Sequence, residues 1–135
     1  MATPQQNADS VRKMYDAFGK GDVAAILDQL HDDVEWGAKS VATEVPWLTW
    51  RKGKSEVQGF FTALASNIAI DVFRPELFVC EGDSVVVKLH IEGVIGKTGA
   101  RNVTDTIHLW TFRAGKVARY QQFDDTAAAR AAWKT

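Results

Sequence analysis

The residues best suited to acid–base chemistry in this chain are its histidines. Two of the three, His90 and His108, lie in stretches where apolar and polar residues alternate. Lys88 precedes His90 by two positions, so the two side chains share a face if the segment is a strand. Imidazole titrates at about pH 6.5, and burial lowers its pKa. Two such histidines in a low-dielectric pocket could move a proton, with one group as base and another donating to a developing oxyanion.

Other arrangements of reactive side chains carry less weight. Asp124 and Asp125 look like paired carboxylates, but adjacent residues in a strand point to opposite faces, and Asp125 suits the start of a helix. His31 with Asp32 and Asp33 is more typical of a solvated helix end than of a metal site. The sequence contains no phosphate-binding loop, no Cys/His metal spacing and no nucleophile elbow. We therefore expect a protein that uses no cofactor and no metal.

The composition is that of an ordinary globular domain. Of 135 residues, 46% are hydrophobic and 24% are charged, which fits one domain over residues 1–135. The net charge is −1 and the charges are spread along the chain, unlike the clustered basic face of a nucleic-acid binder. One cysteine, Cys80, excludes an internal disulfide. With no signal-peptide pattern and no long apolar run, we expect a cytoplasmic protein with no membrane or nucleic-acid partner.

Helical periodicity is confined to the first half of the chain and its end. Apolar residues at positions 11, 14, 15 and 18 follow the spacing of an amphipathic helix. Asp22 is a good N-cap for a second, short helix, and Ser55 with Gln58 predicts the capping box of a third. Residues 37–53 show no clean period and predict a long loop, a type of segment that often covers a binding site. An alanine-rich helix should follow Asp125 or Thr126.

From residue 68 to residue 123 the period of the sequence changes to two. Three glycine-containing turn signals divide this segment into four antiparallel strands. The turn signals are 81–83, 97–99 and 113–116. Helices followed by a strand meander predict an α+β fold.

The strand predicted over 84–96 has two distinct faces. One carries Val85, Val87, Leu89 and Ile91, and the other carries Val86, Lys88, His90 and Glu92. Alternation alone places the first face in the core and the second in water. On the next strand, His108 shares a face with Trp110 and Phe112, which indicates that this histidine is shielded from bulk water.

Five short strings of residues occur in a fixed order along the chain. They are Tyr15-Asp16-Ala17-Phe18 with Gly21-Asp22, Asp32-Asp33-Val34-Glu35-Trp36, Gly53-Lys54-Ser55, Glu81-Gly82-Asp83 and Gly115-Lys116-Val117. Together they resemble the SnoaL-like family of the nuclear-transport-factor-2-like superfamily over nearly the whole chain. The resemblance implies a curved antiparallel sheet that forms a cone, closed by N-terminal helices around an apolar pocket. The class includes ketosteroid isomerases, polyketide cyclases, limonene epoxide hydrolases, scytalone dehydratases and proteins that only bind, so the fold does not give the reaction.

The resemblance also implies which face of the sheet is functional. In relatives the concave face lines the pocket, and the opposite face often packs in a homodimer. On that basis Lys88 and His90 point inward. The apolar face becomes the dimer interface, built from Val87, Leu89 and Ile91 together with Leu109 on the next strand.

Candidate catalytic residues are carried over from the family one position at a time. His90 takes the place of a catalytic aspartate in the epoxide hydrolases and of a histidine in the scytalone dehydratases, and Lys88 takes that of a hydrolase arginine. His108 falls near the oxyanion-holding aspartate of the isomerases. Gln122 stands where hydrolases and cyclases carry an essential aspartate, and Met14 where the isomerases carry a tyrosine. No relative's reacting set is therefore intact.

Two functions follow from these residues. The first is a cofactor-independent isomerase, cyclase, dehydratase or hydrolase acting on an apolar or polycyclic carbonyl compound. His90 is the expected base, with His108, Lys88 or Gln122 as donor, so His90→Ala should remove about a hundredfold of turnover. The alternative, favoured by the missing acidic residues, is a non-catalytic binding protein. The aromatic residues expected to contact the ligand are Tyr15, Phe18, Trp36, Trp47, Trp50, Phe61, Trp110 and Tyr120.

Overall fold

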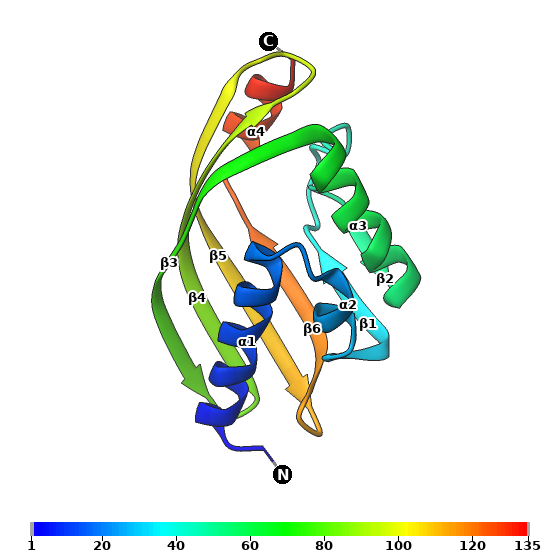
Figure 1. Cartoon of the computed structure of the whole chain (residues 1–135), viewed down its shortest axis with the longest axis vertical. Coiled ribbons are helices and arrows are strands. Elements are labelled where there is room, and N and C mark those ends of the chain that lie inside the picture. Colours follow the sequence, from blue (N-terminus) through cyan, green and yellow to red (C-terminus); the bar gives the residue numbers. More distant parts are fainter. Residues whose placement is uncertain (1, 135) are drawn as a thin grey trace.

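Helices come first and a strand meander follows in the structure, a computed structural model that describes residues 2–134. The helices are α1 (Pro4–Gly19), α2 (Val23–Leu27), α3 (Lys54–Asn67) and α4 (Thr126–Lys134). The strands are β1 (Leu30–Gly37), β2 (Trp50–Lys52), β3 (Ile68–Glu81), β4 (Ser84–Ile95), β5 (Arg101–Arg113) and β6 (Lys116–Phe123). The predicted α+β class and the four strands of the meander are confirmed (Figure 1).

The helix starts follow the predicted caps in two cases out of three. The Asp22 carboxylate accepts from the Ala25 backbone and opens α2, and the Asp125 carboxylate accepts from the Ala128 backbone in the first turn of α4. The capping box predicted at Ser55 is wrong, because the N-cap of α3 is Gly53, two residues earlier, and the helix begins at Lys54. Gly53 has a φ of +84°, a backbone conformation that glycine adopts without strain and that turns the chain from β2 into α3.

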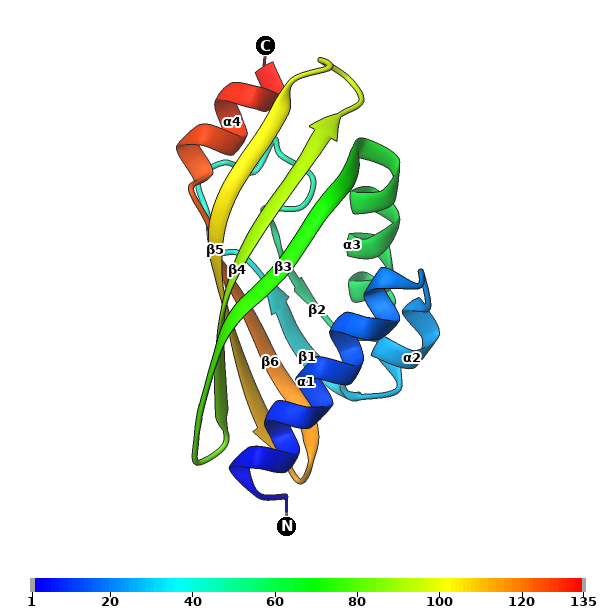
Figure 2. The ribbon, with the colours of Figure 1, turned by 60° about the vertical axis from the view of Figure 1, so that its left-hand side comes forward.

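The strands form one curved sheet in the order β2-β1-β6-β5-β4-β3. The meander β3 to β6 is antiparallel, as predicted, whereas β1 pairs with β6 in parallel. The sheet is therefore mixed rather than purely antiparallel. Register shifts in β3 between residues 70 and 72 and between 75 and 77 mark bulges, which bend a strand and increase its twist. Figure 2 shows the resulting curvature of β3, β4 and β5.

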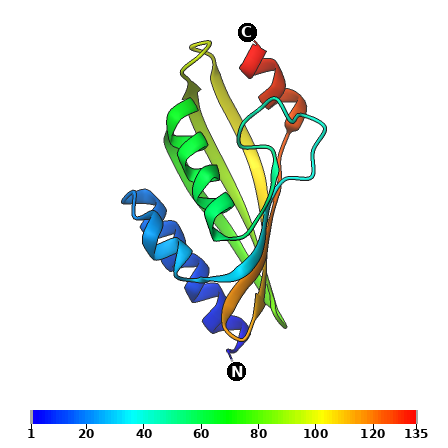
Figure 3. The same cartoon turned by 90° about the vertical axis from the view of Figure 1, so that its right-hand side faces the viewer.

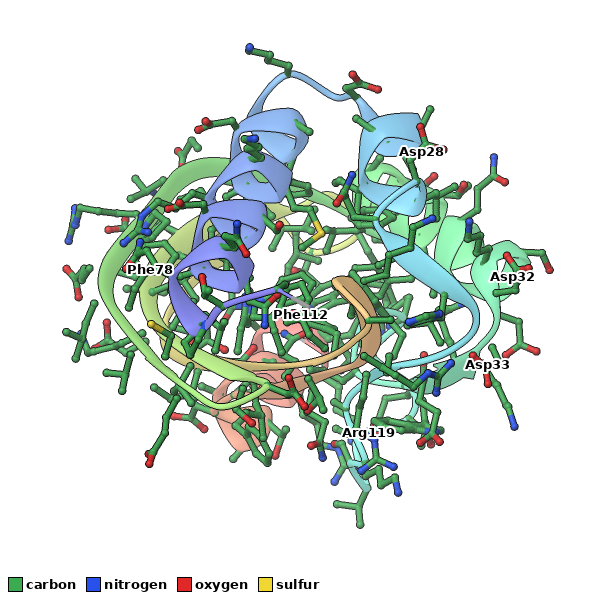
Figure 4. All side chains as sticks on the ribbon, turned by 90° about the horizontal axis from the view of Figure 1, so that it is seen from below. Asp28, Asp32, Asp33, Phe78, Phe112 and Arg119 are labelled. Atoms are coloured by element: carbon green, nitrogen blue, oxygen red, sulfur yellow. The ribbon has the colours of Figure 1, made fainter. Side chains whose placement is uncertain are left out.

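The concave face of the sheet is covered by α1, α2 and α3, which lie together on one side in Figure 3. The core lies between these helices and the sheet, with Val11, Val34, Val57 and Val87 all fully buried. Seen from below, the sheet curves around this core, which takes in Phe112, while Asp28, Asp32 and Asp33 lie at the rim (Figure 4). Within residues 2–134, no helix is long and apolar enough to cross a membrane.

The predicted loop over 37–53 is shorter than expected, because residues 50–52 form β2 against β1. The remaining segment is packed against α4 at one end of the molecule. The Arg130 guanidinium donates to the Glu44 carboxylate and to the Val41 carbonyl, and the Trp133 ring meets the Trp47 ring edge to face at 5.8 Å between centroids. α4 therefore fixes this segment, and Trp47 with it.

Candidate functional site

A cavity of about 80 Å³ lies between the concave face of the sheet and the helices. Its wall is mainly apolar and aromatic, contributed by α1, α3 and the inner faces of β3 to β6. The space exceeds that of one water molecule several times over. An apolar wall with a few polar groups is typical of a site for a small apolar molecule, but the volume is below the roughly 300–1,000 Å³ of most ligand pockets, so a ring-sized ligand requires the cavity to widen.

A chain of hydrogen bonds crosses one wall of the cavity. The Trp110 indole N–H donates to the Tyr15 hydroxyl at 3.1 Å, and the Tyr15 hydroxyl lies 2.8 Å from Nδ1 of His108. An indole only donates, so the Tyr15 oxygen is the acceptor of that first bond. Among residues 2–134 the Tyr15 hydroxyl has no other acceptor, so its buried proton is satisfied when it points to Nδ1 of His108 and Nδ1 accepts. The chain thus places the imidazole proton of His108 on Nε2.

Burial keeps both titratable groups of this chain, Tyr15 and His108, uncharged. The pKa of His108 is lowered to about 3 because the imidazole is removed from water, and burial raises the pKa of Tyr15. His108 is therefore neutral at physiological pH and a weak base. Its Nε2–H has no hydrogen-bond partner among residues 2–134, so it is a donor available to a ligand.

Two further donors in the cavity wall lack a protein partner within the described chain. Nε1 of Trp36 has no hydrogen bond, but it is fully covered by protein atoms, so a ligand reaches it only if the wall rearranges. The Tyr120 hydroxyl makes none either, and burial, with smaller contributions from Tyr15 and Asp124, raises its pKa well above the usual value. The rings of His108 and Tyr120 lie 5.0 Å apart. The cavity therefore offers several neutral donors and should favour a ligand that carries hydrogen-bond acceptors.

A carboxylate lies at the polar end of the cavity. Asp124 lines the wall together with Gln122, Thr104 and Asn102. Its Oδ1 accepts from the Thr104 hydroxyl and from the Asp125 backbone, and its Oδ2 lies 3.3 Å from Nε2 of Gln122. From the sequence alone, Asp124 is considered only as one of a carboxylate pair with Asp125 and set aside. The signal was the period of two along β6, which, continued one residue past Phe123, puts positions 120, 122 and 124 on the same face.

Most of the aromatic residues predicted to contact a ligand do line the cavity. They are Tyr15, Phe18, Trp36, Trp47, Phe61, Trp110 and Tyr120. Trp50 does not, because its ring lies in β2 beneath the Lys39 ammonium, 4.6 Å from the ring centroid. Of the four predicted catalytic residues, His108 and Gln122 also line the cavity.

The inward orientation predicted for Lys88 and His90 is wrong. In β4 the buried positions are Val85, Val87 and Leu89, so the intervening Lys88 and His90 face the outer surface of the sheet. The reason is the larger apolar area of the first set, which the core must bury, and the cost of removing charged groups from water. Neither Lys88 nor His90 lines the cavity.

On the outer surface, His90 belongs to a run of ion pairs that we call the outer ion network. Its Nδ1 lies 2.9 Å from the Asp105 carboxylate and its Nε2 lies 2.8 Å from that of Glu92. Hydrogen bonds first to Asp105 and then to Glu92 raise the pKa of His90. The network spans β3, β4 and β5. Its members are Asp71, Arg74, Glu76, Lys88, His90, Glu92, Arg101 and Asp105.

The predicted dimer interface is wrong in most of its residues, because the apolar face of β4 points inward. Val87, Leu89 and Ile91 face the core or the cavity and are not available to a partner, whereas Leu109 does lie on the outer face. Other apolar residues of the outer face sit beside the ion network in two cross-strand rows. One row is Leu77, Ile107 and Phe123, with Lys88 of the network between Leu77 and Ile107, and the other is Val79, Val86 and Leu109.

The carboxylates at the start of β1, which are of a type that can bind a metal, form ion pairs with basic side chains instead. Asp33 pairs with Arg113 at 3.1 Å and Asp32 with Lys54 at 3.5 Å. Among residues 2–134, no group of three or more His, Cys, Asp or Glu side chains could hold a metal ion.

The fold is similar to that of several solved structures. An NTF2-like protein from Burkholderia pseudomallei has a TM-score of 0.88 and 23% identity over 100% of both chains. TerC, co-crystallised with polyporic acid, has a TM-score of 0.85 and 25% identity over 96% of this chain and 99% of that one. An LEH-like epoxide hydrolase from M. tuberculosis has a TM-score of 0.75 and 11% identity over 97% of this chain and 91% of that one. At such low identity, the first and third of these show the fold alone.

The sequence carries the family signal directly. No curated protein matches it, but the family model of the SnoaL-like domain matches residues 11–120, from the buried stripe of α1 to the cavity face of β6. This confirms the resemblance found in the five short strings. The chain belongs to the SnoaL-like domain family.

Proposed function

We propose that this protein binds a small, mostly apolar carbonyl compound in its cavity, with the carbonyl oxygen accepting a hydrogen bond from Nε2 of His108. The observation that carries the proposal is the chain from Trp110 through Tyr15 to His108, which leaves this N–H directed to a ligand. The Tyr120 hydroxyl, on the neighbouring strand, is the second donor for the same oxygen.

The same donors suit a reaction in which negative charge grows on the carbonyl oxygen. A neutral imidazole with its proton held on Nε2 stabilises such an oxyanion without having to give up a proton. This role differs from the proton relay expected from two histidines, since His90 lies outside the cavity and His108 is a poor base. Reactions that remove a proton from the carbon next to a carbonyl, such as ketone isomerisation, pass through such a charge.

Non-catalytic binding is the second candidate function. It is favoured by Gln122, which is paired with His108 across the two strands and offers an amide where a base would be needed. A donor such as His108 holds the carbonyl of a ground-state ligand as well as that of a reacting one. Turnover measured over a panel of ring ketones would separate the two candidates.

Polyporic acid is the first probe, because TerC has been crystallised with it. Its quinone carbonyls supply the acceptors that the cavity donors require. Binding is measured by calorimetry and by quenching of tryptophan fluorescence, to which Trp36 and Trp110 in the wall should contribute. We expect saturable binding by the wild-type protein.

The decisive comparison is between two histidine variants. His108→Ala removes the donor and should weaken binding about tenfold or more, since a buried acceptor then loses its partner. His108→Gln restores an N–H and should recover part of the loss. His90→Ala is the matched control on the other face of the same sheet and should change affinity by about twofold at most. Equal effects of His108→Ala and His90→Ala would contradict the proposal.

We further propose that two copies of the protein pair through the outer face of the sheet. The support is the set of exposed apolar side chains on that face, which include Val79, Ile107 and Phe123 at 52%, 37% and 52% exposure. Contiguous apolar surface of this kind commonly marks an interface, and a twofold dimer is the commonest closed assembly.

A further inference from the structure

The carboxylate of Asp124 is not used for any evident structural purpose that needs its charge. The helix that follows is capped by its neighbour, Asp125, whose side chain accepts from the Ala128 backbone. No Lys, Arg or His forms an ion pair with Asp124 in the described part of the chain. A negatively charged group thus lies at a cavity wall without a cation to balance it.

The hydrogen bonds of Asp124 leave one oxygen largely free. Oδ1 accepts from the Thr104 hydroxyl and the Asp125 backbone, which fix the orientation of the carboxylate. Oδ2 receives a single bond of 3.3 Å, from Gln122. A carboxylate oxygen accepts about two hydrogen bonds, so Oδ2 keeps room for a donor from a ligand.

The position of Asp124 relative to His108 sets the spacing of the two ligand contacts. His108 is paired with Gln122 across β5 and β6, and Asp124 follows two residues later on the same face. Two residues of an extended chain span about 7 Å. One aromatic ring can bridge groups at that separation, and the wall between them is apolar and aromatic.

We infer that the ligand of this cavity is a hydroxylated ring ketone or quinone, whose hydroxyl donates to Oδ2 of Asp124 while its carbonyl accepts from His108. The inference rests on the proposed carbonyl contact and adds the group at the other end of the molecule. A carboxylate oxygen accepts hydrogen bonds and cannot donate, so it selects for a ligand with a donor, whereas an analogue without one leaves Oδ2 without a partner.

Three small ketones test the inference. In 6-hydroxy-1-tetralone the hydroxyl and the carbonyl lie at opposite ends of one aromatic ring, whereas 1-tetralone lacks the hydroxyl and 8-hydroxy-1-tetralone carries it beside the carbonyl. Dissociation constants are measured by calorimetry or by NMR titration at neutral pH. The wild-type protein should bind 6-hydroxy-1-tetralone about tenfold or more tightly than either of the other two.

Variants at two adjacent carboxylates show which one is responsible. Asp124→Asn retains the size of the side chain but not its charge. It should reduce the preference to about threefold or less, because 1-tetralone no longer leaves a carboxylate without a partner. Asp125→Asn removes the same charge one residue away and keeps a good helix cap, so the preference should persist. Asp124→Ala removes the side chain altogether, and so checks that the reduced preference is not caused by the amide that Asp124→Asn introduces.

Each outcome bears on one of the two proposals. Equal wild-type affinity for 6-hydroxy-1-tetralone and 1-tetralone, or loss of the preference in Asp125→Asn, overturns the inference about Asp124 and leaves the carbonyl contact standing. Failure of all three ketones to bind overturns the proposed function, and the inference with it. An undiminished preference in both Asp124 variants assigns the hydroxyl to another group and also overturns the inference.

Discussion

His108 and His90 lie on neighbouring strands of the same sheet, and their surroundings are opposite in every respect that controls protonation. His108 faces the cavity, is bonded to a neutral hydroxyl, and has its pKa lowered to about 3 by burial. His90 faces outward between the carboxylates of Glu92 and Asp105, which raise its pKa. The difference shows that histidine chemistry in this fold is decided by which face a residue occupies. The cavity uses neutral donors, and the outer face uses paired charges.

The largest expected effect is an acid sensitivity of stability caused by His108. In the unfolded chain its imidazole gains a proton below about pH 6.5, but in the folded protein only near pH 3. The unfolded state therefore binds more protons between these values, and the free energy of unfolding falls as pH falls, by about 1.4 kcal/mol per pH unit at most. Above pH 6.5 this contribution is constant.

Urea unfolding of wild type and His108→Gln between pH 7 and pH 4 measures this effect. Carboxylates with a lowered pKa, among them Asp33 and Glu44, also reduce the free energy of unfolding in acid. They are present in both proteins, so their contribution cancels in the comparison. The variant should have the shallower pH dependence. Parallel curves for the two proteins would mean that His108 takes up its proton without penalty and would break the comparison of the two faces.

Tyr15→Phe should give the next largest effect, because it removes the link that orients His108. The Trp110 indole and Nδ1 of His108 both lose their partner. Leaving buried polar groups unpaired costs about 1–3 kcal/mol each, so the free energy of unfolding should fall by that order. The proton of His108 should no longer be confined to Nε2.

Nitrogen chemical shifts of the His108 ring report this directly. In wild type they should show the Nε2–H form alone, and in Tyr15→Phe a mixture of the two neutral forms. Phe73→Leu, which alters the ring packed on Tyr15 without touching the hydrogen bonds, is the control. A pure Nε2–H form in Tyr15→Phe would show that the hydroxyl does not set the proton position.

Much of the fold could be predicted from the sequence because its signals are local. The helical stripe at positions 11 to 18, the cap at Asp22 and the glycine turns of the meander are each formed within a few residues. The predicted start of α3 is two residues late because a glycine with positive φ gives no side-chain signal. The parallel pairing of β1 with β6 joins segments far apart in sequence, and no local pattern predicts it.

The candidate site was only partly predictable for a related reason. Alternation in β4 places the apolar face in the core, which the structure confirms, and it was the resemblance to relatives that turned Lys88 and His90 toward the cavity. Apolar area distinguishes the two faces correctly. In β6 the same rule of alternation places Asp124 on the cavity face with Gln122, whatever the role of the adjacent Asp125. The bond between Tyr15 and His108 joins residues 93 positions apart, and no local pattern predicts it.

A third prediction concerns the assembly of the outer face. Ile107→Glu places a charge in the apolar row between Lys88 and Phe123, its neighbours across β4 and β6. Removing that carboxylate from water in an interface is costly, and the apolar area of the isoleucine is lost as well, so the dimer should dissociate at least about tenfold more readily. Sedimentation velocity over a concentration series measures this. A wild-type protein that is monomeric at all concentrations would contradict the pairing itself.

The smallest expected effect is that of His90→Gln on stability, and its sign is opposite to that of His108. The pKa of His90 is raised by Asp105 and Glu92, with Arg74 acting weakly in the other direction, so its protonated form stabilises the folded state below about pH 6.5. This stabilisation is lost as pH rises through the raised pKa.

The wild type should therefore exceed His90→Gln in stability at pH 6 by more than at pH 9. The difference should shrink in 1 M salt, because the outer ion network is open to solvent and its interactions are screened. Urea unfolding at the two pH values and two salt concentrations gives the difference in free energy of unfolding between the two proteins under each condition. A difference that grows with pH, or that ignores salt, would mean that His90 acts as a buried neutral group, and the two faces of the sheet would no longer differ as the structure indicates.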